Sequence, residues 1–299
     1  SSPSLDTTVG LNGTIPTELG RLVNLTHLDL SGNALEGPIP EHLFNVSNLQ
    51  SLDLHRNNLN GTLSNRINDL SNLESLVLQH NKLSGEIPES IGSCSKLIRL
   101  NLSDNEFRGE LPSTLPSSLQ EIRVDRNNIN GSLPLDTIRN LTNLREFHAD
   151  RNRLEGEVDD AFSNTTNLER INLGHNKFSG SVPVLRDLIH LTEIILRDNE
   201  FDSVQTESFA GDSSLTILDL SHQRSQGLTL LDYAFALASS HIKLILTGNN
   251  VPVISSYAFD GLNNVPLDLT DLTIHELAPH AFAGTYDLQQ LDLRGNYIT

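Results

Sequence analysis

Arginine and histidine gather in one stretch of an otherwise acidic chain, and they are the residues best suited to chemistry. The 299-residue sequence has 38 acidic and 20 basic residues, which gives a formal net charge of −18. A guanidinium fork can bind a carboxylate or a sulfate through two parallel hydrogen bonds. The candidate ligand-binding residues are Arg99, Arg123, Arg126, Arg145, His148, Arg151, Arg170 and His175.

Acidic residues lie among these basic ones, and they leave a second interpretation open. Asp104, Asp125, Glu146 and Asp150 are interleaved with the arginines and histidines. Exposed ion pairs of this kind compensate one another and contribute little to stability. The sequence therefore allows either a face that binds a partner or a self-compensated ladder of solvated ion pairs.

Motifs of enzymes and metal sites are weak or missing in this sequence. HELAPH (275–280) resembles a zinc metalloprotease motif, but its histidines are five residues apart and Pro279 would break the aligning helix. No glycine-rich phosphate loop follows a predicted strand, and no Ser or Cys occupies a nucleophile elbow. Cys94 is the single cysteine, and we interpret it as a small buried thiol. We therefore predict no catalytic residue, no metal and no cofactor.

Acceptor triplets for N-glycosylation indicate the compartment. Eight N-x-[ST] triplets occur, all before residue 165, at Asn12, Asn24, Asn45, Asn60, Asn101, Asn130, Asn140 and Asn164. Asn12, Asn60 and Asn130 share one position of a repeated segment and are expected to form an exposed column. A chain rich in Asn, Ser and Thr also forms such triplets by chance. If the triplets are used, the protein is extracellular or on the cell surface.

A repeated pattern of leucines and an asparagine must position all of these residues. Segments such as LDLSGNALEGPIP (28–40) and INLGHNKFSGSVP (171–183) align, and self-similarity at this period indicates a solenoid. The L-x-L alternation predicts a short strand, and the Asn amide is expected to satisfy backbone groups of the following turn. The Asn recurs with regular spacings of 22 to 25 residues at Asn33, Asn57, Asn81, Asn105, Asn127, Asn152, Asn176 and Asn199, then at Asn249 and Asn296, with Gln223 and Leu272 in the same position of two further copies.

The motif L-x-x-L-x-L-x-x-N resembles the leucine-rich repeat and covers nearly the whole chain. The resemblance implies an α/β solenoid, a right-handed superhelix of about twelve repeats of roughly 24 residues with a parallel β-sheet on its concave face. Residues 11–183 resemble the plant-type repeats of receptor-kinase ectodomains and polygalacturonase inhibitors. Residues 184–299 resemble the typical-type repeats of cell-surface proteins. Because no linker separates 1–183 from 184–299, we predict one continuous domain, 1–299.

Two columns of residues are expected to shape the side of the solenoid away from the concave sheet. Seven glycines, each four residues after the Asn, are expected to permit tight backbone there: Gly37, Gly61, Gly85, Gly109, Gly131, Gly156 and Gly180. Five phenylalanines are expected to form a column of rings: Phe162, Phe209, Phe235, Phe259 and Phe282. Tryptophan is absent, so a sugar-stacking platform is not indicated. Four tyrosines are spare and favour a protein contact: Tyr233, Tyr257, Tyr286 and Tyr297.

Charge and the resemblance together bound the function. The acidic balance argues against nucleic acid and anionic lipid as partners, and no apolar run is long enough to insert in a membrane. We predict a non-enzymatic extracellular binding module, from a receptor, adhesion or inhibitor protein, that presents its concave surface to a protein, peptide or glycan. The alternative is a self-associating structural or filament-forming glycoprotein of the cell surface or matrix. Both ends of the sequence follow the pattern of internal repeats, so we expect further sequence or another copy of the chain to cover them.

Overall fold

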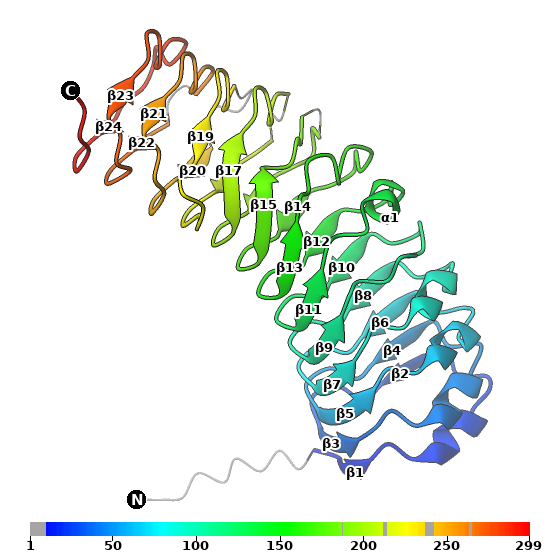
Figure 1. Ribbon diagram of the computed structural model, residues 1–299. Helices are drawn as coiled ribbons and strands as arrows, with labels where there is room; N and C mark the ends of the chain where they lie inside the picture. The colour runs from blue at the N-terminus through cyan, green and yellow to red at the C-terminus, as the bar shows by residue number, and fades with distance from the viewer. Residues whose placement is uncertain (1–9, 187, 212–213, 237–241, 263–264) are drawn as a thin grey trace, which may run out of the picture.

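Twelve stacked turns form a curved solenoid, and each turn contributes strands to parallel sheets (Figure 1). The computed structural model describes residues 10–186, 188–211, 214–236, 242–262 and 265–299. Most of the partial strand expected before Leu11 lies outside these residues. Strand order follows chain order in every sheet, so each turn pairs with the turn before it and the turn after it. The predicted solenoid with a parallel concave sheet is confirmed.

The L-x-L motifs build the concave sheet, because alternate side chains of a strand point to opposite faces. The first residue of the motif is the central residue of the strand, as at Leu76 and Phe147, and it is buried in the core while the preceding residue is more exposed. Ten strands form one parallel sheet: β2 (His27–Asp29), β4 (Ser51–Asp53), β6 (Ser75–Val77), β8 (Arg99–Asn101), β10 (Glu121–Arg123), β12 (Glu146–His148), β14 (Arg170–Asn172), β16 (Glu193–Ile195), β18 (Ile217–Asp219) and β20 (Lys243–Ile245). The last two strands, β22 (Leu267–Asp268) and β24 (Leu291–Asp292), pair separately.

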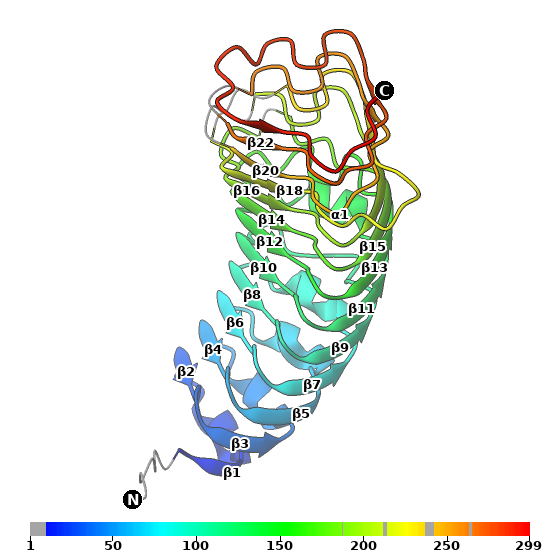
Figure 2. The same ribbon diagram turned by 90° about the vertical axis from the view of Figure 1, so that its left-hand side faces the viewer.

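A second parallel sheet, which the sequence analysis did not predict, runs along an adjacent side of the solenoid (Figure 2). Its strands follow the Asn position of each turn: β1 (Asn12–Thr14), β3 (Ala34–Gly37), β5 (Asn58–Thr62), β7 (Lys82–Gly85), β9 (Glu106–Gly109), β11 (Asn128–Gly131), β13 (Arg153–Gly156), β15 (Lys177–Ser181), β17 (Glu200–Val204), β19 (Thr229–Leu230), β21 (Val253–Ile254) and β23 (Glu276–Leu277). The repeated glycines lie at or near the ends of these strands. At Gly109, φ is +79° and an added Cβ would lie 2.8 Å from Glu86 Cγ, so a larger residue would be strained.

Short helices occupy the convex side of the first half of the chain. Four are 3-10 helices and one is an α-helix: η1 (Thr17–Arg21), η2 (Glu41–Asn45), η3 (Asn65–Asp69), η4 (Glu89–Ser93) and α1 (Leu135–Arg139). In the described residues after Arg139, turns take the place of helices. None of the helices in the described part of the chain is long and apolar enough to cross a membrane.

The Asn ladder performs the role that the sequence predicted for it. Asn176 is 2% exposed, and its Oδ1 accepts a hydrogen bond from the Leu154 amide of the preceding turn at 3.0 Å. Its Nδ2 donates to the carbonyls of Ala149 and Leu173, both at 3.0 Å. Turn backbone that would otherwise be buried without partners is thereby satisfied.

The two copies without Asn behave differently from each other. Gln223 reproduces the ladder, because its Oε1 accepts from the Phe201 amide at 3.2 Å. Leu272 has no side-chain amide. The Val251 N–H donates instead to the backbone carbonyl of Leu272 at 2.8 Å. The side-chain ladder is therefore interrupted at one turn only among the described residues.

The phenylalanine column is confirmed for four of its five members. Phe209, Phe235, Phe259 and Phe282 stack in succession with ring centroids 6.3, 5.7 and 5.8 Å apart. Phe162 packs edge-on against Phe147 instead, with the centroids 5.6 Å apart. The expected five-ring column is thus wrong at Phe162, because the turn between Phe162 and Phe209 has the buried Leu185 at the corresponding position.

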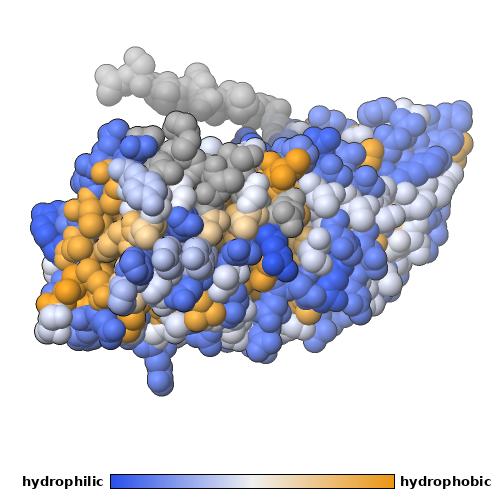
Figure 3. All heavy atoms as spheres, turned by 90° about the horizontal axis from the view of Figure 1, so that it is seen from above, coloured by the Kyte–Doolittle hydropathy of each residue, from blue (hydrophilic) through white to orange (hydrophobic). Residues whose placement is uncertain are grey.

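Apolar side chains are exposed on the last turn. Leu291 is 40% exposed, Tyr297 61% and Ile298 41%. Figure 3, which views the solenoid from above, shows hydrophobic residues gathered on this face.

The single cysteine, Cys94, is buried in the core as predicted, and burial raises the pKa of its thiol to about 11.

Candidate ligand-binding face

The eight candidate basic residues occupy two rows on the concave side. Five lie in or next to the concave strands: Arg99 in β8, Arg123 in β10, Arg145 just before β12, His148 in β12 and Arg170 in β14. The other three, Arg126, Arg151 and His175, lie in the turns that follow β10, β12 and β14. The structure therefore brings all eight onto four neighbouring turns.

Three of the strand arginines belong to an ion-pair ladder that crosses the concave sheet. Arg99 Nε lies 2.8 Å from Glu121, whose other oxygen is 2.7 Å from Arg123 Nε. Glu146 continues the ladder, because its two oxygens lie 2.5 Å from Arg123 Nη2 and 2.5 Å from Arg170 Nη1. Beside it, Arg145 pairs with Glu169 at 2.9 Å.

Electrostatics in the centre of the ladder follow from these contacts. Burial disfavours the charge on Arg123, but hydrogen bonding to Glu146 and the charges of Glu121 and Glu146 raise its pKa overall. Burial likewise works against ionised Glu146, yet its hydrogen bond with Arg123 lowers the pKa of this carboxyl below its usual value. The geometry of this row matches the self-compensated ladder that the sequence left open.

The third residue of the concave strands makes a side-chain hydrogen bond to the following turn in some repeats and not in others. In seven turns this residue is Asp or Asn, and its side chain accepts a hydrogen bond from the backbone N–H two residues later: Asp29, Asp53, Asn101, Asn172, Asp219, Asp268 and Asp292. Three other turns have the apolar residues Val77, Ile195 and Ile245. Two adjacent turns, the fifth and sixth, place Arg123 and His148 there. In the described strands, Arg or His takes this position only in these two turns.

His148 is poorly compensated by its surroundings. Its Nε2 is buried and lies 3.3 Å from Glu146 without hydrogen-bond alignment. Burial, followed by the charge of Arg123, lowers the pKa of His148 from its ordinary value. The imidazole is therefore neutral near pH 7 and available as a hydrogen-bonding group.

A row of ionisable residues, here called the rim, follows the concave strands in eight consecutive turns. All eight have left-handed backbone with φ between +52° and +57°: Arg56, His80, Asp104, Arg126, Arg151, His175, Asp198 and His222. The left-handed region costs an L-residue about 1 kcal/mol, which glycine would avoid. The same position is also left-handed in the other turns, at Gly32, Gly248, Asp271 and Gly295. The backbone is therefore a feature of the repeat, and the ionisable side chains make the rim a candidate functional row.

Two ion pairs between rim residues flank the centre of the rim. His80 pairs with Asp104, and His175 Nδ1 lies 3.1 Å from Asp198. Between these pairs lie Arg126 and Arg151, which are both exposed. Beneath them, on the same turns, are the half-buried carboxyl groups of Asp125 and Asp150.

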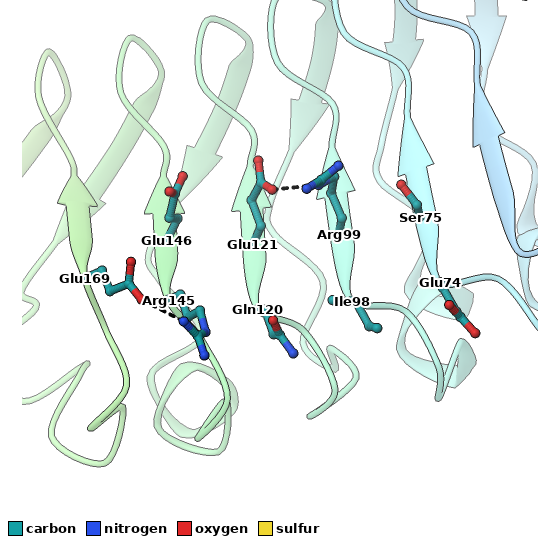
Figure 4. A pocket seen from close by; sticks show the side chains of 9 residues that line it. All are labelled: Glu74, Ser75, Ile98, Arg99, Gln120, Glu121, Arg145, Glu146 and Glu169. Carbon is teal, nitrogen blue, oxygen red and sulfur yellow. Dashed lines mark hydrogen bonds and ion pairs between the residues drawn. The ribbon is translucent and has the colours of Figure 1, made fainter. Parts of the chain in front are cut away.

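A shallow depression of about 340 Å³ lies on the concave sheet beside the ladder (Figure 4). Its lining residues are Glu74, Ser75, Ile98, Arg99, Gln120, Glu121, Arg145, Glu146 and Glu169. Ile98 provides an exposed apolar surface in a charged setting. Glu74 forms no ion pair with any residue that the structure describes. Glu74, Ile98, Glu121 and Glu169 were missed from the sequence, although they precede or begin the predicted strands.

Seven of the eight predicted glycosylation asparagines are exposed, on the second sheet and the convex side. Asn12, Asn60 and Asn130 lie in strands β1, β5 and β11 at the shared position. Asn101 differs, because it is half-buried in the concave strand β8, and its Oδ1 accepts hydrogen bonds from the backbone and side chain of Ser103. Glycosylation itself stays a prediction.

Aromatic residues stack on the last third of the solenoid. Tyr233 and Tyr257 stack with centroids 4.9 Å apart, and His280 stacks on Tyr257 at 5.5 Å. His275 stacks instead on Tyr297 at 5.4 Å, so the two histidines of HELAPH engage different rings. Because neighbouring rings cover one another's faces, a partner would meet ring edges rather than an open stacking platform. The described residues contain no group of three or more His, Cys, Asp or Glu arranged to hold a metal.

Two family models match the chain along almost its whole length. The model described as "Leucine rich repeat" matches residues 23–83 and 47–107. The model described as "BspA type Leucine rich repeat region (6 copies)" matches residues 117–229, 143–265 and 229–299. The chain belongs to the leucine-rich repeat family. The first model matches up to residue 107 and the second from residue 117, and the division into two kinds of repeat at residue 183 stays a prediction.

Known leucine-rich repeat proteins resemble this chain in sequence and fold. The calmodulin-binding receptor kinase CaMRLK of Arabidopsis thaliana is 35% identical over 98 residues, which are 31% of this chain and 14% of that protein. The leucine-rich repeat transmembrane protein FLRT2 of Rattus norvegicus is 34% identical over 106 residues, or 35% of this chain and 16% of that protein. A solved structure that resembles this chain is the leucine-rich repeat ectodomain of the plant membrane receptor kinase GASSHO1/SCHENGEN3 from Arabidopsis thaliana, with a TM-score of 0.82 and 31% sequence identity. The match covers 96% of this chain and 34% of that chain. The matched part of this chain is thus a small fraction of each curated relative.

Proposed function

We propose that this leucine-rich repeat chain is a non-enzymatic extracellular binding module that engages an extended segment of a protein or peptide along its concave face. The observation that carries the proposal is the replacement of the structural Asp or Asn by Arg123 and His148 in two adjacent turns. Elsewhere the repeat replaces this Asp or Asn only by apolar residues, so two adjacent polar exceptions are typical of a functional surface.

Several features support this location for the partner. The rim places ionisable side chains along the same turns, and the depression around Ile98 and Arg99 adjoins them. Leucine-rich repeat solenoids use their concave surfaces for extended binding. The GASSHO1/SCHENGEN3 ectodomain was crystallised in complex with CASPARIAN STRIP INTEGRITY FACTOR 2, and the relatives include a receptor kinase and a transmembrane protein. These likenesses favour a receptor-type module at the cell surface.

The test uses variants that restore the repeat pattern. The chain is first used to select binders from a random 12-residue peptide display library. Arg123→Asn together with His148→Asn returns the turn-capping side chain at both positions, so the variant should fold with an unfolding midpoint close to that of the parent. We expect its binding to the selected peptides to fall at least tenfold by biolayer interferometry.

The matched control is Arg108→Asn, which removes an exposed arginine from β9 of the second sheet. This variant should bind the selected peptides as the parent does. Unchanged binding by the Arg123/His148 variant, or an equal loss in the control, would show that the concave centre is not the binding surface.

The second candidate function is end-to-end self-association, which the exposed Leu291, Tyr297 and Ile298 favour. Light scattering of residues 1–299 over a wide concentration range tests it. Oligomers that dissociate when Leu291 and Ile298 are changed to Ser would support a structural role. A monomer at every concentration would remove this candidate.

A further inference from the structure

The centre of the rim holds two adjacent cationic side chains that the rest of the rim does not neutralise. Arg126 forms no ion pair with any described residue, and the guanidinium of Arg151 approaches Asp150 only to 3.9 Å. Their turns are hydrogen-bonded neighbours, because the Arg126 amide donates to the Asp150 carbonyl at 2.8 Å. On either side, by contrast, the nearest histidines of the rim, His80 and His175, each have an aspartate partner.

Backbone geometry holds both arginines in place. Arg126 has a φ of +53° and Arg151 a φ of +54°, in a region that L-residues occupy only when the surrounding structure fixes them. The backbone amide of each residue is tied to the next turn, at 2.8 Å and 2.9 Å. The two arginine side chains therefore start from adjacent positions of a fixed backbone, from which both guanidiniums can reach one oxyanion.

Two carboxyl groups, those of Asp125 and Asp150, interact electrostatically with these arginines. Asp125 faces Arg123, Arg126 and Asp150, and burial followed by the charge of Asp150 raises its pKa to about 6.

Asp150 faces His148, Arg126 and Arg151, and its burial raises its pKa as well. The groups on the flanking turns are already committed, because His80 pairs with Asp104 and His175 with Asp198. Because Asp125 and Asp150 are buried close to each other, one of them accepts a proton readily when a further negative charge arrives.

We propose that Arg126 and Arg151 form an oxyanion subsite that takes a carboxylate or sulfate group of the partner, and that Asp125 or Asp150 takes up a proton when the subsite fills. This inference rests on the proposed function, because the subsite lies on the same concave surface. The proton comes from the solvent and returns to it when the anion leaves. Partner binding is thereby coupled to acidity, and it tightens as the pH falls through the range in which the aspartates titrate.

Two simple probes test the subsite without a known partner. Sodium sulfate and sodium succinate are titrated separately into the ¹⁵N-labelled chain, with the Nε–Hε signals of the arginines as the readout. We expect saturable shifts of the Arg126 and Arg151 signals, and an apparent affinity about tenfold higher at pH 5.5 than at pH 7.5. The two salts distinguish a sulfate from a carboxylate as the preferred group.

Calorimetry measures the proton directly. Titrations at pH 6.5 in two buffers of different ionisation enthalpy should show net uptake of protons on binding. Asp125→Asn with Asp150→Asn should bind the anion at least as tightly at pH 7.5 and should lose the pH dependence. If the parent shows no proton uptake, or the variant keeps the pH dependence, the coupling is wrong.

Arginine variants separate the subsite from general electrostatics. Arg126→Gln with Arg151→Gln should abolish saturable binding while the unfolding midpoint stays within a few degrees of the parent. The matched control is Arg56→Gln, a rim residue with a φ of +53° whose rim neighbours are not arginines. Equal effects in the control, or no saturable shift in the parent, would overturn the subsite.

These results are independent of the peptide selection. Peptides that require Arg123 and His148, combined with no binding of either salt, would leave the module in place and remove the subsite. Salts that bind at Arg126 and Arg151, combined with no selected peptide, would remove the peptide-binding proposal and keep the subsite.

Discussion

Glu146 accepts a hydrogen bond from Arg170 of the next turn of the solenoid, with 2.5 Å between Glu146 Oε1 and Arg170 Nη1. Its second oxygen is bound to Arg123 of its other neighbour at the same distance. One carboxylate therefore joins three consecutive strands, β10, β12 and β14, across the concave face.

Glu146→Gln removes the charge at the middle of this ladder. Because Arg123 and Arg170 are 36% and 45% exposed, water already screens the pairs, and we expect a loss of only about 1 kcal/mol in unfolding free energy. Urea denaturation at low and high salt measures it, with Glu106→Gln on the second sheet as the control. A loss that high salt leaves unchanged would contradict an electrostatic origin.

Asp125 makes stability depend on pH in a defined direction. Its pKa is raised from 3.8 to about 6 in the folded chain, so the folded state holds this proton more tightly than the unfolded state does. The group therefore stabilises the fold most at low pH, and that contribution is lost as the pH rises through about 6. Asp125→Asn should be more stable than the parent at pH 7.5, by about 1 kcal/mol after allowing for solvent screening, and similar to it near pH 4. Denaturation curves across this range would refute the idea if the difference grew toward acid.

The Asn ladder should be far more costly to break than the ion-pair ladder. Asn176→Ala leaves the Leu154 amide and the Ala149 carbonyl buried without their partner. We expect a loss of roughly 3 kcal/mol in unfolding free energy. The matched control is Asn33→Ala on the partly exposed first turn, for which the loss should be about half as large. Equal losses at the two sites would mean that burial does not set the cost.

Glycosylation should follow exposure. We expect natively sourced protein to lose mass on glycosidase treatment, and site mapping to place glycans on the exposed asparagines such as Asn60 and Asn130. Asn101 should stay unmodified, since its side chain is committed to Ser103 on the concave sheet. An unchanged polypeptide mass would remove the glycosylation argument for an extracellular location.

Periodicity made the concave sheet and its ladder predictable, because each depends on residues that recur within a single repeat. Asn57 and Gln223 could be assigned their role from spacing alone. The second sheet escaped prediction for a physical reason. Segments such as Asn128–Gly131 have weak strand propensity, and they form strands only because the neighbouring turns hold them in register.

The candidate face was predictable in composition but not in pairing. The sequence showed arginines among carboxylates, yet which carboxylate meets Arg123 depends on the register between turns. The left-handed backbone left no sign in residue type at Arg126 and Arg151, since arginine does not favour that region. Stacking of Tyr257 between Tyr233 and His280 likewise needed the three-dimensional register.

The solenoid also has a mechanical weak point. At Leu272 the amide ladder is interrupted, and at the same level the concave sheet ends at β20 while β22 and β24 pair only with each other. Across this seam the backbone is joined by the pairing of β21 with β23 and by hydrogen bonds such as those from Val251 to Leu272 and from Tyr257 to His280. Under a stretching force, as between two adhering surfaces, the turns beyond it would peel away first as one unit. The chain would thus lengthen in a single unfolding step. The turns around Arg123 would stay folded.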